Sequence, residues 1–138
     1  PADQPGKLTA VVEQRAMLAA QDAQAIAVLS ALAQPTRLDA YRALIRSGPE
    51  GMAAGKLADR LEVPQNTLSA HLGILQRAGL VSSTRQSREI IYRPEHEQGR
   101  ELELFLLKDC CGSRPELCAP LFDELTRKPR RKAGAHGC

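Results

Sequence analysis

The stretch AAGKLADRLEVPQNTLSAHLGILQRAGLV, residues 53–81, decides the fold of this chain. Apolar side chains recur at helical spacing within residues 53–61 and again within residues 65–78, which predicts two helices. Val63 and Pro64 separate the two helices, and Gly79 ends the second, because glycine is favoured just after a helix. Two helices joined by a tight turn, the second one longer, form a helix-turn-helix arrangement.

Two short β-strands are expected directly after this stretch, at residues 80–85 and 89–93, with a polar turn between them. A hairpin with a basic tip that follows a helix-turn-helix is a wing. The same hairpin could also serve only to close the core. Arg85 and Arg88 favour the wing, because guanidinium groups suit contacts with a phosphate backbone.

Further helices are predicted on both sides of this region. One begins at Pro35, a favoured first helical residue, and stops within residues 47–51. Residues 9–33 contain neither Gly nor Pro, and they indicate one long helix or two, with Asp22 as the N-cap of the second. Residues 96–108 return to a helical pattern.

The ends of the chain carry weaker patterns. Residues 1–7 are rich in helix breakers and are expected to be loose. Near the other end, Pro115 and Pro120 are expected to interrupt helix, which leaves room for a short helix at residues 121–125. The basic tail after it is expected to be disordered.

The expected fold class is mainly α with a small β-hairpin, a homodimeric winged helix-turn-helix. Its expected parts are an N-terminal extension at 1–24, a DNA-binding and dimerisation domain at 25–109, a cysteine segment at 110–118 and a tail at 119–138. The helices before and after the winged region carry more apolar surface than docking needs, which indicates a dimer interface. The interface residues predicted on these two helices are Ile26, Leu29, Leu32, Leu102, Phe105 and Leu106. Packing of the first helix on its own domain fits the pattern equally well.

Charge is unevenly distributed along the chain. Basic residues number 19 and acidic residues 16, and residues 127–132 hold a basic cluster without an acid. Within residues 64–93, four arginines stand against Glu89 alone, which suits a nucleic-acid-binding face. No apolar run approaches the roughly 18 residues of a membrane span, and no signal peptide opens the chain, so a soluble, cytoplasmic protein is expected.

The first turn of the second helix in the quoted stretch is expected to enter the major groove of double-stranded DNA. Gln and Asn can pair with adenine through two hydrogen bonds, Ser and Thr suit phosphate oxygens, and wing arginines lie along the backbone or the minor groove. A capped helix start with solvated polar residues is the plainer interpretation. The predicted DNA contacts are Gln65, Asn66, Thr67, Ser69, His71, Arg85 and Arg88. His71, taken alone, is more typical of a structural histidine.

The chain resembles the ArsR/SmtB family of metal-responsive repressors. The resemblance rests on ALAQPTRL at residues 31–38, NTLSAHLGILQRAGLV at residues 66–81 and RQSREIIY at residues 85–92. It implies a winged-helix homodimer with the first and last helices at the interface. It also implies a repressor that binds an imperfect inverted repeat in its operator and is released by an inducer.

The chain departs from the family pattern at three places, two of which bear on the inducer. The archetypal arsenic sensor has a Cys-Val-Cys motif in the helix that corresponds to residues 53–61, and this chain has no cysteine there. Zinc-sensing members carry paired Asp/His ligands along the last helix, where this chain offers only His96. Gln34 stands where members often have Asp or Ser, which implies a weaker helix cap.

The remaining candidate site is KDCCGSRPELC, residues 108–118, which holds Cys110, Cys111 and Cys118. It resembles a subgroup of arsenic-responsive members whose site lies at the end of the last helix. As(III) and Sb(III) are soft and take three thiolates, whereas zinc normally takes four ligands. The predicted inducer is therefore As(III) or Sb(III), held by these three cysteines, with His136 and Cys138 able to complete a zinc site instead. No organic cofactor is expected.

Other interpretations of the cysteines remain open at this stage. Two of the three thiols, one of the vicinal pair and Cys118, could form a reversible disulfide in a redox or persulfide sensor on the same fold. They could also be small buried hydrophobes, although Gly, Ser, Arg and Pro surround them. An enzyme with a cysteine nucleophile is not expected, because no base lies next to the cluster in the sequence.

Overall fold

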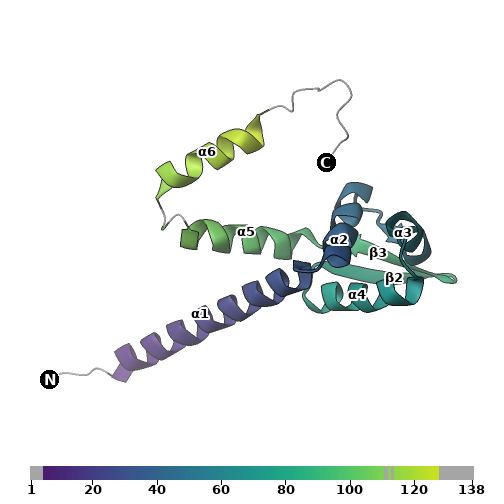
Figure 1. Cartoon of the computed structure of the whole chain (residues 1–138). Helices are drawn as coiled ribbons and strands as arrows, with labels where there is room; N and C mark the ends of the chain where they lie inside the picture. Colours follow the sequence, from purple (N-terminus) through teal and green to yellow (C-terminus); the bar gives the residue numbers. More distant parts are fainter. Residues whose placement is uncertain (1–4, 111, 113, 128–138) are drawn as a thin grey trace. The chain divides into compact units, whose positions relative to one another are not determined.

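The computed structural model of the chain describes residues 5–110, 112 and 114–127, and it divides into two units, Pro1–Leu102 and Glu103–Cys138, each described here by itself. Its elements, which Figure 1 labels except for β1, are α1 (Pro5–Leu32), α2 (Pro35–Ser47), β1 (Met52–Ala53), α3 (Ala54–Leu61), α4 (Gln65–Arg77), β2 (Val81–Gln86), β3 (Glu89–Pro94), α5 (His96–Cys110) and α6 (Pro115–Thr126). This order of helices and strands confirms the predicted class, a mainly helical winged helix-turn-helix.

A row of leucines on α4 forms the centre of the first unit. Leu68, Leu72 and Leu75 recur at a spacing of four and three, so they share one helix face, and all three are fully buried. This face packs against α2 and α3, which contribute the fully buried Leu44 and Leu57. Burying a leucine side chain contributes about 1.5–3 kcal/mol, so this row holds α4 in one rotation.

The turn between α3 and α4 occupies residues 62–64, where the sequence predicts a break. Glu62 has a left-handed backbone conformation with φ 56°, and the N–H of Val63 donates to the C=O of Ala58 over 3.1 Å. The C=O of Pro64 then accepts a hydrogen bond of 3.0 Å from the N–H of Leu68, which starts the next helix. Both predicted helices are confirmed to within one residue at each end.

The strands form a three-stranded antiparallel sheet in the order β1-β3-β2. Strands β2 and β3 make the predicted hairpin, with Gln86 opposite Glu89 and the turn residue Ser87 at φ 56°. Strand β1, which pairs Met52 with Tyr92, was not predicted. Its two residues are too few to show the alternation that identifies a strand in a sequence.

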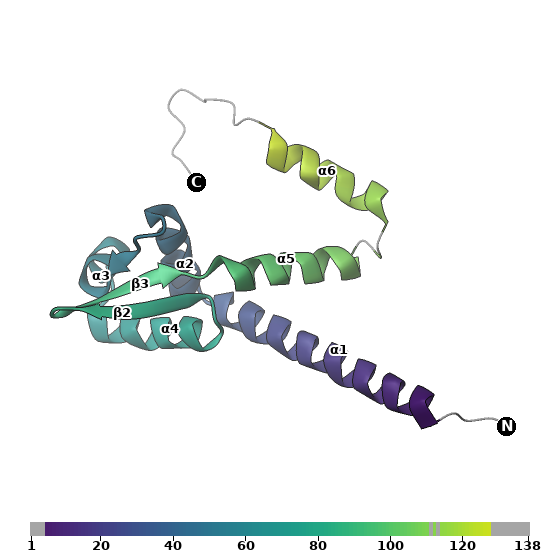
Figure 2. The same ribbon diagram turned by 180° about the vertical axis from the view of Figure 1, so that it is seen from behind.

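Helix α1 is a single helix, which decides between the one-helix and two-helix predictions. It begins at Pro5, so the expectation of loose residues through 7 was wrong, because proline is well tolerated in a first helical turn. Asp22 lies inside the helix and caps nothing. Among residues 8–32 of α1, only Ala25, Val28 and Ala31 are buried, and every residue from 8 to 24 is exposed. Figure 2 shows α1 extending away from the winged region.

Helix α6 in the second unit corrects the expectation for the prolines. Pro115 is the first residue of this helix and Pro120 lies inside it, so neither interrupts it, and the helix covers more than the predicted residues 121–125. Nε of Arg114 donates to Oε1 of Glu116 over 2.8 Å at its start. The carboxylate of Glu116 is stabilised first by a hydrogen bond from its own backbone N–H and second by the hydrogen bond from Arg114. Both bonds lower the pKa of Glu116.

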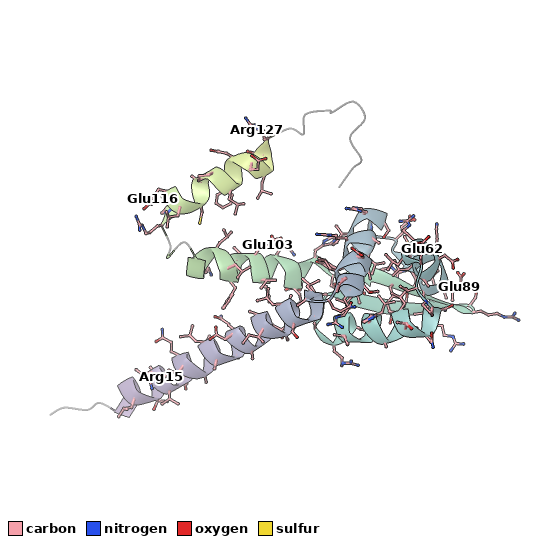
Figure 3. All side chains as sticks on the ribbon, in the orientation of Figure 1. Arg15, Glu62, Glu89, Glu103, Glu116 and Arg127 are labelled. Atoms are coloured by element: carbon pink, nitrogen blue, oxygen red, sulfur yellow. The ribbon has the colours of Figure 1, made fainter. Side chains whose placement is uncertain are left out.

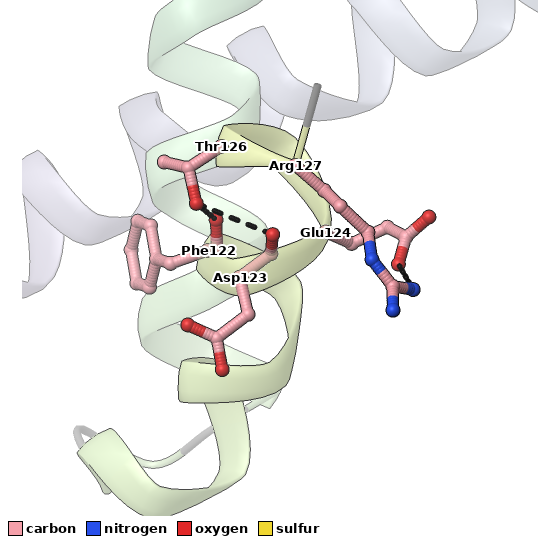
Figure 4. A network of polar contacts seen from close by, with 5 residues as sticks. All are labelled: Phe122, Asp123, Glu124, Thr126 and Arg127. Carbon is pink, nitrogen blue, oxygen red and sulfur yellow. Dashed lines mark hydrogen bonds and ion pairs between the residues drawn. The ribbon is translucent and has the colours of Figure 1, made fainter. Parts of the chain in front are cut away.

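The last turn of α6 closes with side-chain bonds that Figure 4 shows. The hydroxyl of Thr126 donates to the C=O of Phe122 over 3.0 Å and to the C=O of Asp123 over 3.2 Å. Arg127 lies 3.9 Å from Glu124 in an exposed ion pair. The C=O of Asp123 also accepts from the backbone N–H of Arg127 over 3.0 Å, so the Thr126 hydroxyl adds to the backbone bonding of this turn.

Among the described residues, no single helix has both the length and the apolar character needed to cross a membrane. Only α1 and α2 taken together reach that length and composition, and they are bent by 97° where they meet.

Two glycines before β1 allow a prediction about stability. Gly48 and Gly51 both have positive φ, at 83° and 77°, but an added Cβ at Gly48 meets no atom within 4 Å. At Gly51 the same Cβ would overlap the C=O of Tyr92 in β3 and lie 2.7 Å from Cγ of Arg93. We expect Gly48→Ala to cost about 1–2 kcal/mol of unfolding free energy and Gly51→Ala about 3 kcal/mol or more. Urea unfolding followed by circular dichroism measures both, and equal losses would contradict the role of the Tyr92 contact.

Candidate DNA-binding surface and cysteine segment

The first turn of α4 presents four of the predicted DNA contacts together. Gln65, Asn66, Thr67 and Ser69 are all exposed, whereas Leu68 between them is fully buried. Because the leucine face of α4 is turned toward the core, these polar side chains point to solvent. The N-cap position is held by Pro64, which makes no side-chain cap, and Oδ1 of Asn66 accepts a hydrogen bond of 2.9 Å from the N–H of Thr67 in this first turn. The helix dipole makes this end of α4 electropositive. A polar, electropositive helix start of this kind fits the edge of a DNA groove.

His71 occupies a different environment from these four residues. It is half-buried, and its Nδ1 lies 3.3 Å from Nη1 of Arg37 in α2. This contact ties the ring to the body of the domain and favours the structural interpretation of His71. The structure therefore separates His71 from the exposed group.

Arg37 is a residue of this region that the sequence analysis missed. Its Nε donates to the C=O of Ala31 over 2.6 Å, and its Nη2 to the C=O of Ser30 over 3.4 Å, both in the last turn of α1. Together with the His71 contact, these bonds connect α1, α2 and α4 through one guanidinium. The only sequence signal for Arg37 was its place in ALAQPTRL, residues 31–38. In the same motif, the side chain of Gln34 caps α2 by accepting a hydrogen bond from the N–H of Arg37 over 2.8 Å.

The wing presents the other predicted DNA contacts. Arg85 in β2 and Arg88 in the turn are exposed, near the Glu89 labelled at the tip of the hairpin in Figure 3. Nε2 of Gln76 lies 3.2 Å from Oγ of Ser83, which bonds the end of α4 to β2. Arg93 donates to the hydroxyl of Thr84 and links β3 with β2. The wing is thus held against α4 while its two arginines remain available.

The cysteine segment is described only in part. Cys110 is the last residue of α5, Gly112 has φ 55°, and Cys118 lies in the first half of α6. Cys118 is 9% exposed and disulfide-bonded. The side chain of Cys110 and all of Cys111 lie outside the described residues, as do His136 and Cys138. Within the described part of the chain, no group of three His, Cys, Asp or Glu side chains could hold a metal ion. The three-cysteine site stays a prediction.

The predicted interface residues fall into two groups. Leu32 and Leu102 are partly buried against the core of their own unit. Phe105 is half-buried, whereas Ile26, Leu29 and Leu106 are exposed. In α1, Ala25, Val28 and Ala31 are buried and Leu32 packs against the core, so Ile26 and Leu29 are left for another contact. The dimer interface itself stays a prediction.

Comparison with known proteins bears on the region that carries this surface. A family model described as a helix-turn-helix domain matches residues 32–84. The biofilm growth-associated repressor of Agrobacterium fabrum is 33% identical over 90 residues, which cover 65% of this chain and 74% of the relative. The HTH-type transcriptional repressor SmtB of Mycobacterium tuberculosis is 41% identical over 66 residues, covering 48% of this chain and 47% of SmtB.

Solved structures show the same fold. HlyU from Vibrio cholerae has a TM-score of 0.52 at 31% identity, over 64% of this chain and 95% of HlyU. An ArsR-like transcriptional regulator from Rhodococcus has a TM-score of 0.55 at 26% identity, over 78% and 96% of the two chains. A "possible transcriptional regulator for arsenical resistance" has a TM-score of 0.53 at 27% identity, over 69% and 93%.

The wing arginines yield a prediction about DNA affinity. We expect Arg85→Ala and Arg88→Ala each to weaken binding to any duplex, and to reduce the slope of log K against log salt by about one per lost phosphate contact. Fluorescence anisotropy at several salt concentrations measures both quantities. Arg42→Ala, which removes an exposed arginine from α2, is the control. An unchanged salt slope in both wing variants would mean that the wing does not touch phosphate.

The bonds of Arg37 yield a second prediction. Arg37→Met keeps most of the length of the side chain but removes every hydrogen bond to α1 and to His71. Because two carbonyl groups lose a charged donor, we expect a loss of about 2–3 kcal/mol of unfolding free energy. His71→Ala removes only the contact that Arg37 makes with α4, so it should lower the unfolding free energy by less. Urea unfolding compares the two variants, and an equal or larger loss in His71→Ala would contradict a central role for Arg37.

Proposed function

Because the chain belongs to the ArsR/SmtB family of winged helix-turn-helix transcriptional regulators, we propose that it represses an arsenic-resistance-type operon. In this proposal a homodimer binds an imperfect inverted repeat in operator DNA and leaves it when cysteine thiolates bind As(III) or Sb(III). Members of this family are DNA-binding regulators and not enzymes, and this much is established for the chain. As a regulator of DNA, it would act in the cytoplasm.

The observation that carries the DNA-binding role is the exposed polar turn of α4 beside the exposed wing arginines. Gln65 and Asn66 would read base edges in the major groove, and Thr67 and Ser69 would bind phosphate oxygens. A symmetric dimer would place two such helices about 34 Å apart, one turn of DNA, which explains why the operator should be an inverted repeat. Repression is favoured by the names of the Agrobacterium and Mycobacterium relatives.

The chemistry of the cysteine segment supports a metalloid inducer. Cys118 is buried and disulfide-bonded, so a second sulfur atom lies within reach of its own. Soft thiolates select soft ions, and As(III) and Sb(III) are satisfied by three of them. In their reduced form, Cys110, Cys111 and Cys118 would supply such a set. The similarity to a regulator named for arsenical resistance adds support.

The position of the segment suggests how an inducer would release DNA. Adjacent residues on a helix point about 100° apart, so Cys110 and Cys111 could not share one ion while both remain helical. Helix α5 ends at Cys110, and Gly112 follows in a left-handed conformation that lets the chain turn. Binding would therefore reshape the end of α5. If α5 belongs to the dimer interface, the two reading heads would shift, and a coupling of about 1–3 kcal/mol would favour release.

A redox or persulfide sensor on the same fold is the second candidate. The disulfide of Cys118 favours it, because an oxidant would close this sulfur pair and a thiol reductant would open it again. Vicinal cysteines pair poorly with each other, so either Cys110 or Cys111 would pair with Cys118. The two candidates share their residues and differ in the inducer that they require.

A titration of the reduced protein against a labelled fragment of its own promoter distinguishes the two candidates. We expect near-stoichiometric arsenite or antimonite to release the DNA, with a fall in anisotropy, and zinc to have no effect, because three thiolates leave zinc one ligand short. Release by peroxide or polysulfide alone would overturn the metalloid proposal in favour of redox sensing.

Cysteine substitutions test the ligand set. We expect Cys118→Ser to abolish release by arsenite while DNA affinity stays within about twofold, because Cys118 lies outside the α4 turn and the wing. Cys138→Ser, which removes the fourth cysteine of the chain, is the matched control and should respond normally. Unchanged release in Cys118→Ser would replace the three-thiolate site with one formed by two cysteines.

A further inference from the structure

His71 uses only one of its two ring nitrogens in the contact that ties it to the domain. Its Nδ1 lies 3.3 Å from Nη1 of Arg37. A guanidinium group donates hydrogen bonds and accepts none, so Nδ1 is the acceptor in this contact and carries no hydrogen. The hydrogen bond at one ring nitrogen decides which nitrogen is protonated. The imidazole of His71 is therefore neutral, with its N–H at Nε2.

The guanidinium of Arg37 is held in place from the side opposite to His71. Its Nε donates to the C=O of Ala31 over 2.6 Å, and its Nη2 donates to the C=O of Ser30 over 3.4 Å. Both carbonyl groups belong to the last turn of α1, where the negative end of the helix dipole favours a cation. No carboxylate pairs with Arg37 among the described residues. Arg37 thus keeps its positive charge and its orientation toward His71.

The Nε2 atom of His71 reaches the surface of the domain. Within the described part of the chain, His71 makes no hydrogen bond besides its contact with Arg37. No side-chain nitrogen or oxygen atom of the described residues is both buried and without a partner. Because Nε2 has no partner, it is accessible to solvent. One edge of the half-buried ring is thus fixed to the domain, and the other edge presents an N–H donor.

The position of His71 on α4 indicates what this donor would meet. At about 100° per residue, His71 lies about 40° from Thr67 and about 60° from the buried Leu68. It therefore stands on a flank of the helix, whereas the exposed Asn66 and Ala70 stand on its outward face. When a helix enters a DNA groove, its outward face meets base edges and its flanks face the sugar-phosphate walls.

We propose that Nε2–H of His71 donates to a phosphate oxygen of the DNA backbone beside Thr67, and that Arg37 is the positioning residue for this donor. The contact rests on the DNA-binding role of the proposed function and adds a neutral donor to it. A side chain that is already fixed loses little conformational freedom when DNA binds. Because the imidazole is neutral, the contact releases no counterion, whereas each phosphate contact of a wing arginine does.

Two substitutions of His71 separate the roles of its two nitrogens. The amide of asparagine reaches the place of Nδ1, and the amide of glutamine reaches the place of Nε2. His71→Asn keeps an acceptor for Arg37 but loses the surface donor, so DNA binding should weaken about tenfold while the unfolding free energy stays unchanged. His71→Gln keeps the donor but loses the acceptor for Arg37. Its DNA affinity should stay within about threefold of that of the unmodified protein, while its unfolding free energy falls.

Fluorescence anisotropy and urea unfolding of the full chain measure these two quantities. Full DNA affinity in His71→Asn would overturn the phosphate contact. Equal losses of DNA affinity in His71→Asn and His71→Gln would overturn the assignment of the donor to Nε2. Either result leaves the proposed function intact, provided that the unmodified protein binds DNA. An unmodified protein that binds no duplex would overturn the proposed function and the contact together.

Salt and sequence identify the group that His71 meets. Anisotropy is measured at several salt concentrations on the labelled promoter fragment and on a duplex of scrambled sequence. A neutral donor to phosphate predicts that His71→Asn weakens binding to both duplexes by the same factor and leaves the slope of log K against log salt unchanged. A loss confined to the promoter fragment would replace the phosphate with a base edge. A slope smaller by about one would contradict a neutral imidazole.

Nuclear magnetic resonance tests the role of Arg37 as the positioning residue. Long-range proton–nitrogen spectra at about pH 8, where imidazole is neutral, should show His71 only in the Nε2–H form. The chain has three histidines, and the signal that disappears in His71→Asn is that of His71. Arg37→Met should make the Nδ1–H form of His71 detectable. A ring protonated at Nδ1 in the unmodified protein, or a spectrum of His71 unchanged in Arg37→Met, would overturn the role of Arg37.

Discussion

The burial of one leucine face on α4 is the constraint on which the rest of the structure depends. Leu68, Leu72 and Leu75 admit only one rotation of this helix against α2 and α3. That rotation places residues 65–67 and 69 on the surface as a group, and within the group the N–H of Thr67 donates to Oδ1 of Asn66 over 2.9 Å. The wing follows from the same constraint, because Gln76 at the far end of α4 bonds Ser83 in β2. Apolar packing thus positions a polar surface, and the charges of that surface are free to serve binding.

Two side chains extend this constraint to α1. Gln24 bonds the end of α4 through the C=O of Ala78, and Arg37 bonds the last turn of α1 while it contacts His71 near the middle of α4. Helix α4 is therefore connected to α1 at two points along its length. A partner that displaces α1 acts on the reading helix directly, with no need for a long chain of contacts. This connection is the physical reason why the end of α1 belongs to the same unit as the winged region.

The cysteine segment depends on a different kind of constraint, the proximity of sulfur atoms. A disulfide and a metalloid site both require thiols to approach one another, and Cys118 meets this requirement from a buried position in α6. Geometry alone cannot separate an oxidant from a soft ion as the inducer. What separates them is chemistry: a metalloid needs reduced thiolates and leaves their oxidation state unchanged, whereas a redox sensor gives up two electrons from the same sulfur pair.

Local signals in the sequence by themselves determined the two helices of residues 53–78, the break at Val63 and Pro64 and the hairpin after Gly79, because helix periodicity, proline and glycine act over a few residues. They also indicated which side chains at the start of α4 are polar, and which cysteines cluster. Strand β1 and the contact of Arg37 with His71 were decided only by the tertiary structure, since each joins residues far apart in the chain. Helix α6 runs through Pro120, where the local rule expected a break. For α1, the sequence pattern showed that the helix carries much apolar surface. It did not show which apolar side chains face the domain and which stay exposed. Packing alone decided that Ala25, Val28 and Ala31 face the domain, which leaves Leu18, Ile26 and Leu29 exposed.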